Sequence, residues 1–189
     1  MAVLSDEIIR SMGFASVGEN VQLSDKASIY GVDKIAIGSN VRIDDFVVIS
    51  AGMDGIVIGS NVHIAVYSSL IGTGKITLSD FSNISSRVAI YSSNDDYSGI
   101  SLTNPTVPEA YKSVMHAPVF IGRHVIIGSG SVILPGVSIG EGAAIGALSL
   151  VREGCEKFSI YCGNPAKKIK KRKRCLLEKE QNYLNSSKK

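Results

Sequence analysis

The sequence contains no tryptophan, and aromatic residues account for only 6% of its 189 positions. Hydrophobic residues nevertheless reach 44%, and glycine occurs 19 times. A chain of this length can form one domain with a sizeable core. Because large aromatic side chains are scarce, that core must be built mainly from aliphatic residues.

Cysteine is scarce as well. The three cysteines, Cys155, Cys162 and Cys175, are separated by 7 and 13 positions and form no Cys-x-x-Cys pair. An odd number at these spacings argues against a disulfide framework and against a metal-binding knot. We therefore expect reduced thiols, no metal site and a cytoplasmic protein.

Long apolar runs are also missing. The first 14 residues lack a basic segment followed by a long apolar core, and no later stretch could span a membrane. The net charge is only +3, although basic residues gather at 167–174. Nucleic-acid binding would need a broader basic face with stacking aromatic side chains. We expect a chain without a leader peptide, a membrane span or a nucleic-acid partner.

The strongest positive signal is a six-residue repeat over residues 121–151. An aliphatic residue returns at every sixth position, at Ile121, Ile127, Ile133, Ile139, Ile145 and Val151. Four of the five hexads place glycine directly after it. Six is the period of a parallel β-helix made from hexapeptides, in which three hexads close a triangular coil of about eighteen residues. The aliphatic residue would point inward, and the glycine would sit at a corner where its backbone freedom is useful.

The same pattern extends toward the N-terminus. Coil starts at Ile37, Ile58 and Leu78 lie 21 and 20 residues apart, which equals three hexads plus a bulge of two or three residues. Ahead of them, residues 5–13 match a short amphipathic helix that would cover the first open coil. We divide the chain into a capping helix at 1–14, a β-helix domain at 15–165 and a basic, helix-capable tail at 166–189.

The period fails over residues 91–118. This stretch carries three of the five prolines and no hexad. An excursion of this length inside a regular solenoid is either functional or disordered. Its tyrosine, leucine, valine and methionine residues give it side chains to pack with, which favours an ordered loop.

The hexads, the single excursion before the last coils and the ending GNPAKKI at 163–169 resemble the hexapeptide-repeat acyltransferases. Within that family the pattern is similar to the galactoside, maltose and serine acetyltransferases and to enzymes that acetylate sugars of bacterial surface polysaccharides. The resemblance covers about residues 15–170. It implies an all-β, left-handed parallel β-helix that forms a homotrimer. It also implies acetyl transfer from acetyl-CoA to a hydroxyl or amino group of a sugar.

In that family, acetyl-CoA lies in a groove between two neighbouring prisms, and the loop of one subunit reaches over it. The resemblance places the pantetheine arm beside Gly128 and Ser129, in the run IGS, and beside Ala147 in the next coil. These residues are small, as a backbone that must approach a thin ligand requires.

The phosphates of CoA would meet the basic end of the chain. Lys167 and Lys170 match the family's basic residues near the nucleotide, and ammonium groups attract phosphate charges. The Thr-Lys pair that often follows this coil in the family is replaced by Arg152 and Glu153, so the positive charge moves by one position.

The general base is less obvious. The family commonly uses a loop histidine, but at that place this chain offers Asn94, Asp95 and Asp96, and Ala65 replaces an asparagine that contacts the acceptor in sugar O-acetylating relatives. Asp95 could be the base if partial burial raises its pKa, or His116 could fold back from the far end of the loop. An amine acceptor could also attack without a side-chain base. The candidate catalytic residues are therefore Asp95, His116 and Asn94.

Other functions leave weaker traces. A zinc carbonic anhydrase shares this prism, but its histidine ligands lie closer together than His116 and His124, which are eight residues apart. We interpret His63 and His124 as surface or groove-wall residues. A non-catalytic trimeric scaffold would show itself by failing to bind acetyl-CoA. The acceptor stays open between a sugar hydroxyl, a nucleotide-linked amino sugar and another small alcohol or amine.

Overall fold

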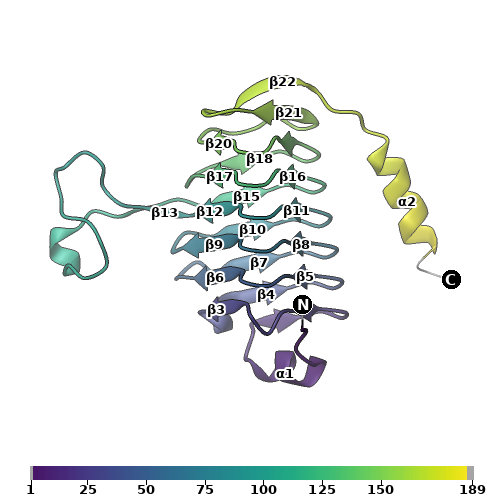
Figure 1. Ribbon diagram of the computed structural model, residues 1–189, viewed down its shortest axis with the longest axis horizontal. Coiled ribbons are helices and arrows are strands. Elements are labelled where there is room, and N and C mark those ends of the chain that lie inside the picture. Colours follow the sequence, from purple (N-terminus) through teal and green to yellow (C-terminus); the bar gives the residue numbers. More distant parts are fainter. Residues whose placement is uncertain (1, 187–189) are drawn as a thin grey trace.

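The computed structural model describes residues 2–186 and shows a triangular prism of stacked β-coils (Figure 1). Each coil contributes one short strand to each of three sheets, and neighbouring coils pair in parallel. We number the sheets faces 1, 2 and 3 in the order in which the chain meets them, and name each corner by the two faces that it joins. The parallel β-helix expected from the hexads is confirmed.

The strands of each face are short and evenly spaced in the sequence. Face 1 consists of β1 (Ser16–Val17), β4 (Ile35–Ile37), β7 (Ile56–Ile58), β10 (Ile76–Leu78), β15 (Val119–Ile121) and β18 (Ser138–Ile139). Face 2 consists of β2 (Gln22–Leu23), β5 (Arg42–Ile43), β8 (His63–Ile64), β11 (Asn83–Ile84), β16 (Ile126–Ile127), β19 (Ala144–Ile145), β21 (Ser159–Cys162) and β22 (Lys167–Lys171). Face 3 consists of β3 (Ser28–Tyr30), β6 (Val48–Ala51), β9 (Ser69–Gly72), β12 (Ala89–Tyr91), β17 (Val132–Ile133) and β20 (Leu150–Val151).

Three columns of aliphatic side chains run along the inside of the prism. They are Ile37, Ile58, Leu78, Ile121 and Ile139 on face 1, Ile43, Ile64, Ile84, Ile127 and Ile145 on face 2, and Ile49, Leu70, Ile90, Ile133 and Val151 on face 3. Each is at most 3% exposed. Burying an aliphatic side chain of this size contributes about 2 kcal/mol, so the columns supply most of the driving force for stacking.

The glycine that follows the aliphatic residue does not have the role expected from the sequence. Left-handed φ angles occur two residues later, as at Asn40 (57°) and Tyr67 (62°). Gly38 has no positive φ, but a Cβ atom there would lie 2.7 Å from the carbonyl carbon of Gly59 in the next coil. Glycine is therefore required by the close approach of the next coil and not by backbone freedom.

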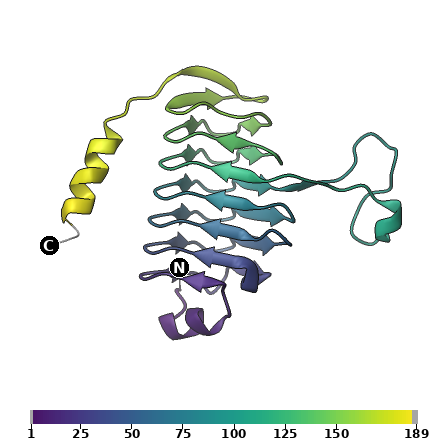
Figure 2. The same ribbon diagram turned by 180° about the vertical axis from the view of Figure 1, so that it is seen from behind.

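The excursion is an insertion at the 3–1 corner. That corner already carries extra residues in earlier coils, because Ile49 and Ile58 are nine positions apart where one hexad would give six. Its base is an antiparallel pair formed by β13 (Ser93–Asn94) and β14 (Met115–His116), and its outer part contains the 3₁₀ turn η2 (Glu109–Tyr111). The arm projects away from the prism in both views (Figures 1 and 2).

Helices lie at the two ends of the chain. Helix α1 (Asp6–Ser11) is capped by Ser5 and buries Ile9 against the first coil, whereas Ile8, expected on the same face, is 48% exposed. A second 3₁₀ turn, η1 (Val32–Lys34), occupies the 3–1 corner of the first coil. At the other end, β22 pairs antiparallel with β21, so Lys167–Lys171 extends face 2.

Helix α2 (Leu176–Ser186) follows this strand and contacts the 1–2 corner. Its Glu180 carboxylate accepts hydrogen bonds from Arg123 and His124, and its Tyr183 ring meets Phe81 edge-on. The expected helical tail is therefore confirmed. Within residues 2–186, no helix has both the length and the apolar character needed to cross a membrane.

Candidate active site

The predicted residues for the pantetheine arm lie together on the 2–3 corner. This corner joins β16 to β17 in the fifth coil and β19 to β20 in the sixth, so Ser129 and Ala147 occupy the same place one coil apart. Both are exposed, and the Ser129 carbonyl accepts a hydrogen bond from the Leu148 amide. The corner therefore presents a strip of small residues parallel to the prism axis, as an extended ligand would require.

Gly128 has a structural reason of its own at this corner. A Cβ atom on Gly128 would lie 2.5 Å from the amide nitrogen of Ala147 and 2.8 Å from the carbonyl carbon of Gly146. Both are backbone atoms of the next coil, so neither can move without disturbing the stack. The smallness of Gly128 serves coil stacking before it serves any ligand.

Gly128→Ala is therefore expected to destabilise the fold. Overpacking of this kind costs about 1–3 kcal/mol in the free energy of unfolding, which chemical denaturation would measure. Gly154→Ala is the matched control, because its Cβ atom would lie no closer than 3.4 Å to the Ser138 carbonyl oxygen. Equal stability of the two variants would contradict the stacking role.

The predicted phosphate-binding residues lie at the C-terminal end of the prism. Arg152 and Lys167 line a hollow of about 150 Å³ that also contains Cys155. Burial raises the pKa of the Cys155 thiol to about 11, so this thiol stays protonated near neutral pH. Lys170 lies on β22 opposite Ile160, and its neighbour Lys168 donates to Glu156 across 2.6 Å. The exposed ammonium groups of Lys167 and Lys170 are thus available at this end for an anionic ligand.

Asp95 and Asn94 lie where the arm leaves the prism. They line a hollow of about 400 Å³ together with Tyr91 and Tyr97 and with Val132 and Leu134 of the next coil. Asp95 is exposed in the single chain, so the partial burial expected from the sequence is not present there. If Asp95 is to be desolvated, another surface must cover it.

Asp96 is unsuited to the same role. Its carboxylate accepts hydrogen bonds from Ser98 and from the backbone and side chain of Ser101, at distances of 2.7–3.0 Å. The bonds from Ser98 and Ser101 lower the pKa of Asp96, so it stays ionised and holds the turn of the arm. Among the acidic residues of the arm's base, Asp95 is the one left for proton transfer.

His116 faces a different hollow from Asp95. It lines a space of about 520 Å³ with residues of the earlier coils, including Ser50, Ile71 and Thr73. Its Nδ1 atom lies 2.8 Å from the Ser93 hydroxyl, and that hydroxyl accepts a hydrogen bond from the Thr73 amide. If the hydroxyl proton goes to Nδ1, the other ring nitrogen carries the ring proton and cannot accept one. The structure thus separates His116 from Asp95.

The candidate residues are divided between two corners of one prism. Ser129 and Ala147 lie on the 2–3 corner, whereas Asp95, His116 and Arg152 follow face-3 strands and lie on the 3–1 corner. Face 3 separates the two sets. A single chain therefore does not bring the predicted donor groove and the predicted base together.

Two further sequence interpretations concern residues away from these corners. Ala65, which replaces the acceptor-binding asparagine, is only 7% exposed and cannot offer a contact. His124 is held by Glu180 beneath α2, and burial together with the charge of Arg123 lowers its pKa. His124 thus belongs to the docking of α2.

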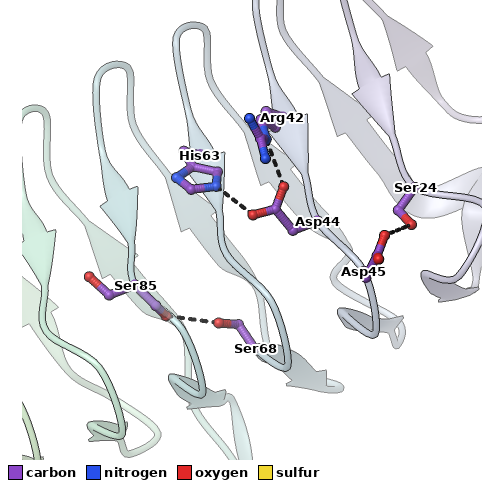
Figure 3. A network of polar contacts seen from close by, with 7 residues as sticks. All are labelled: Ser24, Arg42, Asp44, Asp45, His63, Ser68 and Ser85. Carbon is purple, nitrogen blue, oxygen red and sulfur yellow. Dashed lines mark hydrogen bonds and ion pairs between the residues drawn. The ribbon is translucent and has the colours of Figure 1, made fainter. Parts of the chain in front are cut away.

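Sequence reasoning missed a charged cluster on the second and third coils. The Asp44 carboxylate accepts hydrogen bonds from Arg42 Nε at 2.7 Å and lies 2.9 Å from His63 Nε2, and Figure 3 shows both side chains converging on it. His63, interpreted from the sequence as a surface residue, is thus one member of an organised group. The spacing of Arg42 and His63 by one coil of 21 residues was the available signal, but it becomes visible only once coil length is known.

Comparison with known proteins agrees with this architecture. Residues 118–153 match the family described as bacterial transferase hexapeptide (six repeats). Over 187 residues the chain is 58% identical to a dTDP-4-amino-4,6-dideoxy-D-glucose acyltransferase of Escherichia coli, which covers 99% of this chain and 97% of the relative.

Two solved structures match over nearly the whole chain. One is AntD, an N-acyltransferase from Bacillus cereus, in complex with dTDP and 3-hydroxybutyryl-CoA, with a TM-score of 0.95, 47% identity and coverage of 99% of this chain and 98% of that one. The other is a single-serine variant of AntD in complex with dTDP-4-amino-4,6-dideoxyglucose and coenzyme A, with a TM-score of 0.94, 47% identity and 98% coverage of both chains.

Proposed function

This chain belongs to the bacterial hexapeptide-repeat sugar acyltransferases, and we propose that its acceptor is the free amine of a dTDP-linked amino-dideoxy sugar. The observation that carries the proposal is the 58% identity over 99% of the chain to an enzyme named for that acceptor. The amine resolves a choice that the sequence left open, between hydroxyl and amino groups. Acetyl-CoA is the proposed donor, and a surface polysaccharide is the proposed destination of the sugar.

The chemistry requires one proton to be removed. The lone pair of the neutral amine attacks the carbonyl carbon of the thioester, a C–N bond forms, and the C–S bond breaks. Coenzyme A leaves as a thiolate and takes up a proton, while the nitrogen gives up one proton to a base. The products are an amide on the sugar and free coenzyme A, so no metal or redox cofactor is needed to balance the reaction.

The residues of this chain can be given roles in that reaction. Ser129 and Ala147 form the strip along which the pantetheine arm lies. Arg152, Lys167 and Lys170 attract the phosphates of coenzyme A at the C-terminal end. Asp95 accepts the amine proton, because Asp96 is committed to its turn and His116 faces another hollow. Asn94, beside it, is available to hydrogen-bond the sugar.

A homotrimer would complete the site. The donor strip and Asp95 lie on different corners of one prism, so each active site needs the 2–3 corner of one subunit and Asp95 of the partner subunit. The arm supports this arrangement, since Tyr97 and Ile100 are 88% and 90% exposed in the single chain and would gain a surface to cover. Because CoA thioesters and nucleotide sugars are made in the cytoplasm, the proposal places the enzyme there.

The acceptor is tested by comparing an amine with a hydroxyl. We expect dTDP-4-amino-4,6-dideoxyglucose to be acetylated with a kcat/KM at least about 10²-fold above that of dTDP-6-deoxyglucose, which carries oxygen at the same carbon. Release of the free thiol from acetyl-CoA measures both rates. A parallel series with 3-hydroxybutyryl-CoA tests the acetyl donor. Equal rates with the two sugars would contradict the proposed acceptor.

A further inference from the structure

The charged cluster on the second and third coils is more ordered than an ordinary surface ion pair. The Asp44 side chain is 14% exposed, whereas those of Arg42 and His63 are 53% and 41% exposed. Both carboxylate oxygens are engaged, one by each partner. Burial alone would raise the pKa of Asp44, but the bonds from His63 and Arg42 outweigh it and lower the pKa. Asp44 therefore acts as a fixed anchor for two side chains whose ends reach solvent.

The unused donors of the cluster point to an anionic ligand. Asp44 engages Nε of Arg42 and Nε2 of His63, and among residues 2–186 no hydrogen bond is formed by the two terminal guanidinium nitrogens or by Nδ1 of His63. The nearby Asp45 is neutralised separately, by Ser24 at 2.5 Å and Lys26 at 3.7 Å. A guanidinium held in this way presents a planar pair of N–H donors, the geometry that matches a phosphate group.

The fold itself does not require these charges. Positions equivalent to Asp44 in the other coils carry Ser24, Ala65, Ser85, Gly128 and Gly146, all of them small and uncharged. A cross-strand ion pair on an exposed sheet contributes only about 0.2–1 kcal/mol. Arg42, Asp44 and Asp45 also line a hollow of about 180 Å³ with Val66, so there is room beside the cluster for part of a ligand.

The cluster lies in line with the donor strip. Asp44 begins the 2–3 corner of the second coil, and Gly128 and Ser129 occupy that corner three coils further on, a separation of about 14 Å at the spacing of parallel strands. With the phosphates of coenzyme A at the C-terminal end, the thioester points toward the N-terminal coils. The acceptor must meet it from that side. A hexose with its diphosphate extends over a comparable length.

We propose that Arg42 and His63, oriented by Asp44, bind the diphosphate of the sugar-nucleotide acceptor. This inference rests on the proposed function, since it assumes that the acceptor carries a diphosphate. Arg42 supplies its two terminal nitrogens, and His63 adds an Nδ1 donor when protonated. Asp44 is a positioning residue, which fixes both partners without touching the ligand.

The test is binding of dTDP, with thymidine as a probe that lacks the phosphates. Arg42→Gln is expected to raise the Kd of dTDP at least about tenfold and to leave the Kd of thymidine and of coenzyme A unchanged. His63→Gln should raise the Kd of dTDP less, and Asp44→Asn should raise it with Arg42 and His63 still present. In turnover, Arg42→Gln should raise KM for the amino sugar and leave kcat within about threefold.

Arg10→Gln is the matched control, because Arg10 is also an exposed arginine in an ion pair, with Glu19 at 3.0 Å. If wild-type protein binds dTDP and the Arg42 and His63 variants bind it equally well, the diphosphate lies elsewhere and this inference is wrong, while the proposed acceptor stands. A fall in kcat with unchanged KM would also overturn it, because the cluster would then act in the chemical step. If wild-type protein binds no dTDP, both this inference and the proposed acceptor fail.

Discussion

Asp95→Asn is expected to lower kcat by about 10²–10⁴ with little change in the Kd of acetyl-CoA. The amide keeps the shape and hydrogen-bonding reach of the carboxylate but cannot accept a proton at neutral pH. The expectation depends on Asp95 being free, and in the structure it differs from Asp96, whose oxygens hold the turn of the arm. Steady-state kinetics with the amino sugar, together with calorimetry of acetyl-CoA binding, measure both quantities.

His116→Asn is the control for this prediction. Its hollow lies over the earlier coils and its Nδ1 atom faces Ser93, so we expect a change in kcat of less than about tenfold. A large loss in His116→Asn with full activity in Asp95→Asn would assign the base to His116. If neither variant loses more than about tenfold, the amine loses its proton without a side-chain base.

Ser129→Trp is expected to abolish acetyl-CoA binding, with an increase in Kd of at least about 10²-fold. The indole would fill the strip of small residues along the 2–3 corner, where the pantetheine arm has no other path close to the backbone. Because Ser129 is exposed, the larger side chain does not enter the core, and the fold should be unaffected. Ser138→Trp, an exposed serine on face 1, is the matched control for surface bulk. Unchanged binding in Ser129→Trp would place the groove elsewhere.

The two variants together test the shared site. If each active site takes Ser129 from one subunit and Asp95 of the partner subunit, mixed trimers of Asp95→Asn and Ser129→Trp chains contain sites with both native residues. Random exchange of equal amounts would restore about a quarter of the wild-type activity, although each variant alone is inactive. Absence of any recovery, in mixtures shown by mass spectrometry to be exchanged, would mean that both residues act within one chain. Light scattering of the unmixed variants verifies that each still forms the proposed trimer.

The β-helix could be read from the sequence because its repeat is local. Each hexad forms one strand and one corner, so the positions of Ile121, Ile127 and Ile133 already determine which side chains point inward. The excursion at 91–118 could be located for the same reason, as the place where the repeat stops. The role of the glycines was misassigned, because the constraint on Gly38 comes from Gly59 in the next coil and not from its own φ angle.

The candidate site could be predicted only in part. The resemblance identified Ser129, Ala147 and Asp95 one by one, each from a short motif. It could not show that they lie on different corners, because the corner that a residue occupies depends on the sum of all coil lengths before it. The exposure of Asp95 and the commitment of Asp96 to a turn depend on how the arm folds, which has no repeat to guide a prediction.

The sequence alone thus determined the inward columns, the length of each coil and the place of the arm, because a period of six is set by residues close together in the chain. The tertiary structure alone decided which side chains meet between coils. Arg42 and His63 become neighbours because the intervening coil takes 21 residues, and one residue more or fewer would have paired different side chains. Contacts between coils depend on that register, so the Asp44 cluster and the two-cornered site emerge only when the coils are stacked.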